Sequence, residues 1–160
     1  MILTSQNGGI LIPNGEVRTA SIGDATELAR LSNQLGYPAS VRDVELRLHG
    51  MEASPEHRVL VACLEEEAVV GWIHVYISLR IESNPFGELG GFVVAEDHRR
   101  RGIGRALLGA AETWLTGRGI ETIRVLCRST RVDAHAFFEQ AGFSMTKDQR
   151  VFDKQIMIDV

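Results

Sequence analysis

The chain has 160 residues, is 44% hydrophobic and 24% charged, and carries a formal net charge of −4 at pH 7. This balance is typical of one globular domain that can bury a core, and it excludes a general attraction to nucleic acid or to an anionic membrane. No apolar stretch approaches the roughly 20 residues that cross a bilayer, and the N-terminus lacks the pattern of a signal peptide. We therefore expect a cytoplasmic protein without nucleic-acid or membrane partners.

The N-terminal residues show no periodic pattern. Residues 1–15 are rich in Gly, Asn, Ser and Pro, so we expect an irregular extension there. A first strand is predicted over residues 17–21. The sequence therefore predicts one domain over residues 16–160.

Two helices are predicted after this strand from their start signals. Asp24 followed by Glu27, and Ser40 followed by Asp43, have the capping-box spacing that satisfies free N–H groups at a helix start. Pro38 forces a turn between the two helices.

The rest of the chain alternates strands with helices. Apolar, β-branched runs predict strands over residues 59–64, 68–78, 88–94 and 123–127 and a final pair over 143–145 and 151–158. The acidic run over residues 65–67 indicates a hairpin loop. Amphipathic patterns predict helices over residues 103–115 and from a Thr130 cap to Gly142. The fold class is α/β (α+β), with a mixed, mostly antiparallel sheet flanked by helices.

The most informative segment covers residues 92–108 and passes from a strand through a basic loop into a helix. Its arginines surround the start of the helix: Arg99, Arg100, Arg101 and Arg105. A helix N-terminus carries about half a positive charge, so these side chains repel one another and the helix dipole unless an anion binds there. Free N–H groups and glycines that allow close approach predict a pyrophosphate site.

Two other interpretations of this segment exist. The arginines alone are also compatible with a basic surface loop before a core helix. A dinucleotide fingerprint, with Glu121 as the ribose-binding acid, requires a glycine directly after the strand and a third glycine. Here residues 95–101 intervene and the third glycine is absent, so the spacing disfavours a dinucleotide site.

Two motifs resemble those of a known family. Arg99-x-x-Gly102-x-Gly104 after an apolar strand resembles the Arg/Gln-x-x-Gly-x-Gly/Ala signature of the GNAT superfamily of acetyl-CoA-dependent N-acetyltransferases. Residues 131–143 resemble the family's second segment, Ala-His-x-Phe-Tyr-Glu-x-x-Gly-Phe. The resemblance implies transfer of acetyl from acetyl-CoA, without a metal, to a primary amine by direct attack in a ternary complex. A small-molecule amine is the favoured acceptor, and the resemblance also implies a homodimer formed through the C-terminal strands.

The resemblance implies which residues bind acetyl-CoA. Strand backbone would hold the pantetheine arm and polarise the thioester carbonyl, and the basic loop would hold the pyrophosphate. The implied cofactor-binding residues are Phe92, Val93, Val94, Arg99, Arg100, Arg101, Gly102, Ile103, Gly104, Arg105, His135 and Phe138.

The resemblance also implies a base and a missing acid. Glu88 opens the strand that leads to the cofactor, and a carboxylate near this place would deprotonate the amine through water. The family commonly has a tyrosine where this chain has Phe138, which cannot donate a proton. Either the thiolate leaves without help, or another group replaces that hydroxyl: Tyr76, Ser129, His135 or Cys127.

The acceptor site is expected on two elements. By the period of two, His74 shares a strand face with Trp72 and Tyr76 and is placed to line the acceptor pocket. Tyr37, in the loop between the first two helices, lies where family members shape this pocket. Glu82, in the loop before the strand over residues 88–94, and Glu88 favour a cationic acceptor by charge complementarity. The alternative from another class is a degenerate member that binds acyl-CoA as a sensor or interaction module.

Overall fold

The computed structural model describes residues 2–65 and 68–159, and the chain divides into two compact units, one ending at Leu126 and the other beginning at Cys127. The strands, all in the first unit, are β1 (Ile10–Ile12), β2 (Gly15–Thr19), β3 (His57–Leu64), β4 (Val69–Ser78), β5 (Phe86–Val94) and β6 (Ile123–Val125). The helices are α1 (Ala25–Gln34), α2 (Val41–Glu52), α3 (Ile103–Thr116) and α4 (Val132–Gln140), with short 3-10 helices η1 (Ile22–Asp24) and η2 (Glu96–His98). Of the predicted hairpin loop over residues 65–67, residues 66 and 67 lie outside the described residues.

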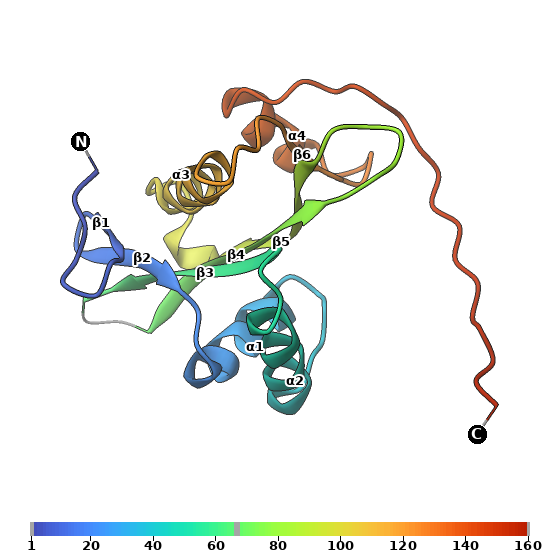
Figure 1. The fold of residues 1–160 in the computed structure, drawn as a ribbon. Coiled ribbons are helices and arrows are strands. Elements are labelled where there is room, and N and C mark those ends of the chain that lie inside the picture. The colour runs from blue at the N-terminus through green and yellow to red at the C-terminus, as the bar shows by residue number, and fades with distance from the viewer. Residues whose placement is uncertain (1, 66–67, 160) are drawn as a thin grey trace. The chain divides into compact units, whose positions relative to one another are not determined.

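The strands form one sheet in the order β1-β2-β3-β4-β5-β6 (Figure 1). All neighbouring strands are antiparallel except β5 and β6, which are parallel. The central strands carry β-branched residues that fit a sheet covered on both faces, and Val61, Ile73 and Val75 have no exposed surface. The predicted mixed, mostly antiparallel sheet flanked by helices is confirmed.

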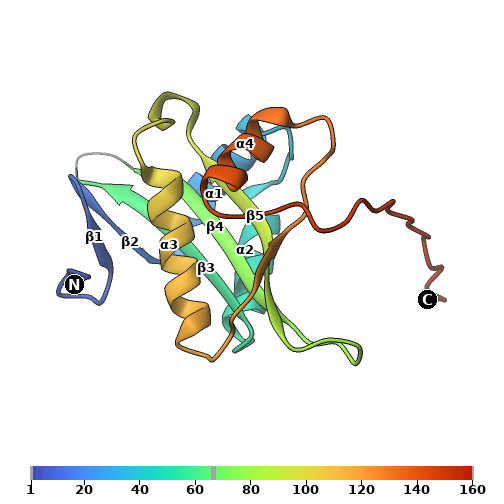
Figure 2. The ribbon, with the colours of Figure 1, turned by 90° about the horizontal axis from the view of Figure 1, so that it is seen from above.

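Helices cover both faces of the sheet in the first unit. α1 and α2 lie against one face and α3 lies against the other (Figures 1 and 2). Gly71 of β4 faces α3, because a side chain there would meet Leu107 of that helix. Since side chains alternate along a strand, Trp72, His74 and Tyr76 of β4 point to the face covered by α1 and α2.

The two helices on that face have different start signals. At α2 the predicted capping box is confirmed, because the Asp43 N–H donates to Ser40 Oγ at 3.1 Å and the Ser40 N–H donates to Asp43 Oδ2 at 3.2 Å. Before α1 the box lies one turn earlier than predicted. The Ser21 N–H donates to Asp24 Oδ2 at 2.8 Å, and Arg18 donates to both carboxylate oxygens of Asp24 at 2.8 and 2.9 Å.

The N-terminal extension contributes a strand to the sheet and is not irregular throughout. β1 pairs with β2 through the register Ile10↔Val17 and Ile12↔Gly15. The turn between these strands contains Asn14 at a φ of 61°, a left-handed conformation that asparagine tolerates. Part of the Gly, Asn and Pro content that predicts an irregular extension therefore forms a hairpin turn. The domain boundaries at residues 15 and 16 stay a prediction.

The predicted final strand pair is wrong. Residues 143–159 contain neither helix nor strand, and their large apolar side chains are exposed, with Phe152 at 88% and Met157 at 90%. An apolar pattern identifies segments able to form strands, but a strand also needs a partner for its backbone groups, and no described residue pairs with these. The predicted Thr130 cap is also wrong, because α4 begins after Arg131 without a side-chain cap.

Candidate active site

The sheet is open along one edge of β5. β6 pairs only with residues 87–89 of β5, whereas β5 continues to Val94. Within the described residues, the backbone of residues 90–94 therefore has no strand partner on that side. Free N–H and C=O groups along a strand edge can bind an extended ligand in the way of an added strand.

A bulge lies where β6 leaves β5. The register of β4 against β5 shifts between His74 and Val75, which makes Gly90 the extra residue of β5. A Cβ on Gly90 would overlap Nδ1 of His74, and one on Gly91 would overlap the ring of Trp72. The two glycines therefore allow both rings to pack directly on the strand backbone beside the open edge.

Glu88 is a buried carboxyl group at the same place. Its residue is only 6% exposed, it lies opposite Tyr76 in the register of β4 and β5, and the Tyr76 hydroxyl donates a hydrogen bond to Glu88 Oε2. Burial and this hydrogen bond raise the pKa of Tyr76 to about 12, so the phenol keeps its proton at neutral pH. This hydrogen bond holds the Glu88 carboxylate in place at Oε2. The other oxygen, Oε1, can accept a proton.

A pair of histidines extends this cluster. His57 Nδ1 lies 2.8 Å from His74 Nε2, with ring centroids 5.1 Å apart, and the His57 ring stacks on the Tyr76 ring at a centroid distance of 5.2 Å. Burial, and then the neighbouring His57, lower the pKa of His74 to about 4. His74 is therefore neutral at neutral pH, next to the open edge of β5.

The lowered pKa of His74 predicts a loss of stability in acid. Between pH 6.5 and about 4, an unfolded chain binds a proton on this ring that the folded chain does not bind. The free energy of unfolding should therefore fall as the pH falls through this window. Melting temperatures across the window should decline less steeply for His74→Gln than for the wild type, and an equally steep decline would contradict this assignment.

The basic loop lies between the end of β5 and the start of α3. Arg100 and Gly102 are both left-handed, with φ of 63° and 80°. The hydrogen-bond ladder of α3 begins with the Ala106 N–H, which donates to the Gly102 carbonyl at 3.0 Å, so the first N–H groups of the helix face the loop. Arg99 Nε donates to the Val94 carbonyl at 3.3 Å. The loop is thus joined to the open strand, and this positive helix end can bind a phosphorylated chain.

Four predicted site residues belong to the second unit, among them Cys127, which is exposed. One ring nitrogen of His135, Nε2, lies 2.9 Å from the Arg128 carbonyl oxygen and donates to it. Phe138 packs edge-on against Phe137 and Phe143, each at a centroid distance of 5.2 Å. Ser129 lies in the turn before α4.

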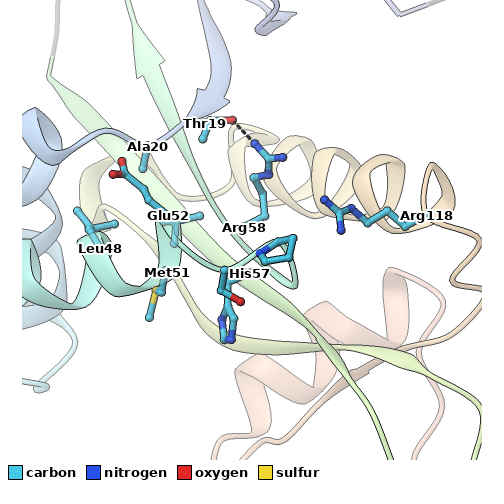
Figure 3. Close-up of a pocket in the computed structure, with 11 residues that line it drawn as sticks. Thr19, Ala20, Leu48, Met51, Glu52, His57, Arg58 and Arg118 are labelled. Atoms are coloured by element: carbon cyan, nitrogen blue, oxygen red, sulfur yellow. Dashed lines mark hydrogen bonds between the residues drawn. The ribbon is translucent and has the colours of Figure 1, made fainter.

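Tyr37 and a pocket both belong to the first unit. Tyr37, in the loop between α1 and α2, is 54% exposed. A pocket of about 190 Å³ is lined by His57 together with Met51 of α2 and Arg118, which follows α3 (Figure 3). None of residues 88–94 lines it. Among the described residues, no helix is long and apolar enough to span a membrane, and no cluster of three His, Cys, Asp or Glu side chains is placed to hold a metal ion.

Three residues of this site are not among the predicted site residues: Gly90, Gly91 and His57. The adjacent glycines Gly90 and Gly91 inside a predicted strand are a recognised signal for a bulge or a close approach, and they could have been found. His57 precedes the predicted strand over residues 59–64, and no local pattern shows that it pairs with His74.

An open strand edge that continues into a basic helix start fits the class of transferases that hold an extended, phosphorylated acyl donor such as acyl-CoA. Within that class, the chain matches the Acetyltransferase (GNAT) family over residues 25–143, and it belongs to this family. It is 32% identical over 136 residues to the aminoglycoside N(6′)-acetyltransferase type 1 of Stenotrophomonas maltophilia. The matched region covers 82% of this chain and 87% of that protein.

Solved structures share the fold. The aminoglycoside N-acetyltransferase AAC(6′)-Iy in complex with CoA has a TM-score of 0.80 at 17% identity, over 91% of this chain and 100% of that one. The aminoglycoside 6′-N-acetyltransferase AAC(6′)-IG of Acinetobacter haemolyticus has a TM-score of 0.76 at 23% identity, over 88% and 98%. Together with the family match, these findings confirm the predicted class: the protein is an acetyl-CoA-dependent N-acetyltransferase.

Proposed function

We propose that the protein acetylates a primary amine of a polycationic small molecule of the aminoglycoside kind, by direct attack of the amine on acetyl-CoA in a ternary complex. The observation that carries this proposal is the buried Glu88 carboxyl beside the open edge of β5, where an acyl chain and an ammonium group can meet. The curated relative at 32% identity, an aminoglycoside acetyltransferase, supports the acceptor class.

The proposed acetyl-CoA site follows the open strand into the helix start. The backbone of Phe92, Val93 and Val94 binds the pantetheine arm, and one N–H of this strand polarises the thioester carbonyl. Pyrophosphate binds at the basic loop through charge-assisted hydrogen bonds and the first N–H groups of α3. The loop residues assigned to it are Arg99, Arg100, Arg101, Gly102, Ile103, Gly104 and Arg105.

Glu88 is the proposed base. An amine with a pKa of about 10.4 reaches the site as an ammonium, and the buried carboxylate accepts its proton directly or through one water molecule. The Tyr76 hydroxyl holds the carboxylate in place through the hydrogen bond to Oε2. Tyr76 acts in this proposal through Glu88, because its raised pKa makes it a weak proton donor.

The CoA thiolate leaves without a protein acid in this proposal. Its pKa of about 8.5 makes it a stable leaving group near neutral pH, and Phe138 offers no proton. The His135 ring already donates to the Arg128 carbonyl, which supports a structural role. An unchanged kcat in Ser129→Ala would support unassisted departure, and a large loss would assign the acid to Ser129.

The proposed acceptor site combines one negative charge with neutral rings. Glu88 supplies the charge, and His74 and Trp72 lie on the two glycines of the bulge. Tyr37 is accessible in the loop between α1 and α2 and forms the outer wall. This combination favours a cation that also presents apolar ring faces.

A homodimer in the cytoplasm completes the proposal. Residues 143–159 expose apolar side chains that include Met145, Val151 and Phe152, and such surface is usually covered by a partner. A second copy of the chain supplies that cover. Sedimentation of the full chain should give twice the monomer mass, and a stable monomer at micromolar concentration would overturn this part.

A panel of amines tests the acceptor class. The purified protein is given acetyl-CoA with sisomicin, with neamine or with glucosamine 6-phosphate, whose phosphate should be repelled by Glu88. We expect kcat/KM for the two polycations to exceed that for the anionic amine by roughly tenfold or more, which corresponds to about 1.4 kcal/mol. Mass spectrometry should show one added acetyl group. A preference for the anionic amine, or no turnover of any amine, would overturn the proposal.

A further inference from the structure

His57 is the partner of the histidine that lies at the open edge. Its Nδ1 lies 2.8 Å from Nε2 of His74, and the two ring planes are inclined by only 19° to one another. A hydrogen bond between two imidazoles needs one N–H donor and one bare nitrogen. The pair therefore has two arrangements, which differ in the nitrogen of His74 that carries its proton.

The other ring nitrogen of His74 lies at the site. Gly90 is exposed at the bulge, and a Cβ on it would overlap His74 Nδ1. Across residues 2–65 and 68–159, this nitrogen has no hydrogen-bond partner. Because His74 is neutral at neutral pH, Nδ1 presents either an N–H or a lone pair to an incoming ligand.

An ammonium group distinguishes these two arrangements. It offers only N–H donors, so His74 Nδ1 can accept a hydrogen bond from it only when that nitrogen carries no proton. We propose that His57 accepts the Nε2–H of His74 and thereby positions His74, so that its bare Nδ1 accepts an N–H of the acceptor ammonium beside Gly90. His57 is then a positioning residue and His74 a binding residue. The identity of the ligand rests on the proposed function, whereas the arrangement of the two rings does not.

Nitrogen-15 NMR of the histidine rings tests the arrangement in the wild-type protein. The chain has five histidines, and the signals of His74 are those that disappear in His74→Gln. The chemical shifts and long-range couplings of a ring show which nitrogen carries the proton. We expect the proton of His74 on Nε2 at neutral pH. A proton on Nδ1 would overturn the proposal.

Two substitutions of His57 separate its hydrogen bond from its packing. His57→Asn places an amide oxygen near the position of Nδ1 and keeps an acceptor for His74, but it loses the stacked ring. His57→Phe keeps a ring against His74 and Tyr76 but removes the acceptor. If His57 only packs, the asparagine variant should be the more impaired of the two.

The proposal predicts the opposite order. His57→Phe should raise KM for sisomicin roughly tenfold, because a hydrogen bond to a charged group is lost. KM for sisomicin in His57→Asn should stay within about threefold of the wild-type value. KM for acetyl-CoA should be unchanged in both. A greater rise in KM for sisomicin in His57→Asn than in His57→Phe would contradict the positioning role. If the wild type acetylates no amine, the proposed function fails, and the ring spectra still decide this inference.

Discussion

Replacing Glu88 with glutamine is expected to lower kcat for amine acetylation at neutral pH by roughly 100-fold or more, the usual scale of a lost general base. Glutamine has the shape of glutamate and can still accept a hydrogen bond from Tyr76, so the packing of the buried site is retained. It cannot accept a proton from the ammonium. The loss should appear in kcat, with KM for acetyl-CoA little changed.

The pH dependence gives this prediction a second readout. As the pH approaches the pKa of the amine, about 10.4, the acceptor loses its proton to solvent and the deficit of Glu88→Gln should shrink. Glu112→Gln is the matched control, because Glu112 is exposed on α3 and lies outside the proposed site; its kcat should equal that of the wild type. Full activity of Glu88→Gln at neutral pH would show that Glu88 is not the base.

Reversing two charges in the basic loop is expected to weaken acetyl-CoA binding by roughly 100-fold. Arg100 and Arg101 are exposed beside the start of α3, and each charge-assisted hydrogen bond to the pyrophosphate is worth about 1.5–3 kcal/mol. The double variant Arg100→Glu, Arg101→Glu loses these bonds and adds repulsion. Calorimetric titration with CoA measures the change in Kd.

The control for this variant must change the net charge equally. Arg42 and Arg47 are exposed on α2, and reversing both should leave Kd for CoA within about twofold, because the added charges are screened by salt over about 10 Å. The Kd of the wild type should rise with ionic strength and that of the loop variant should rise less. Equal weakening by the two double variants would indicate an effect of net charge and not of a pyrophosphate site.

The fold of the first unit could be predicted where local patterns determine it. β3 has a continuous buried run over residues 59–62, and β4 alternates between buried and half-buried residues over residues 71–76. The Ser40–Asp43 pair satisfies free N–H groups at the start of α2. The lack of strands over residues 143–159 could not be predicted in this way. Their apolar residues suit a strand, but whether a strand forms depends on a partner that the pattern of residues 143–159 does not contain.

The same distinction applies to the site. The basic loop and its glycines form one continuous segment, so their chemistry is visible in the sequence. Gly90 and Gly91 carry a recognisable signal, but the rings that pack on them come from another strand. The His57–His74 pair joins residues 17 positions apart, and it depends on the register of β3 against β4, which no local pattern specifies. Side chains brought together by register could be found only in the structure.

The central claim is that acetyl-CoA binds along the open edge of β5 and at the start of α3. Backbone amide NMR of the labelled protein during titration with acetyl-CoA tests it directly, because each N–H reports its own surroundings. The largest shifts should occur at residues 90–94 and 102–105, with little change around Thr19, Met51 and Arg118 in the pocket of Figure 3. Shifts centred on that pocket, with residues 102–105 unaffected, would contradict the account.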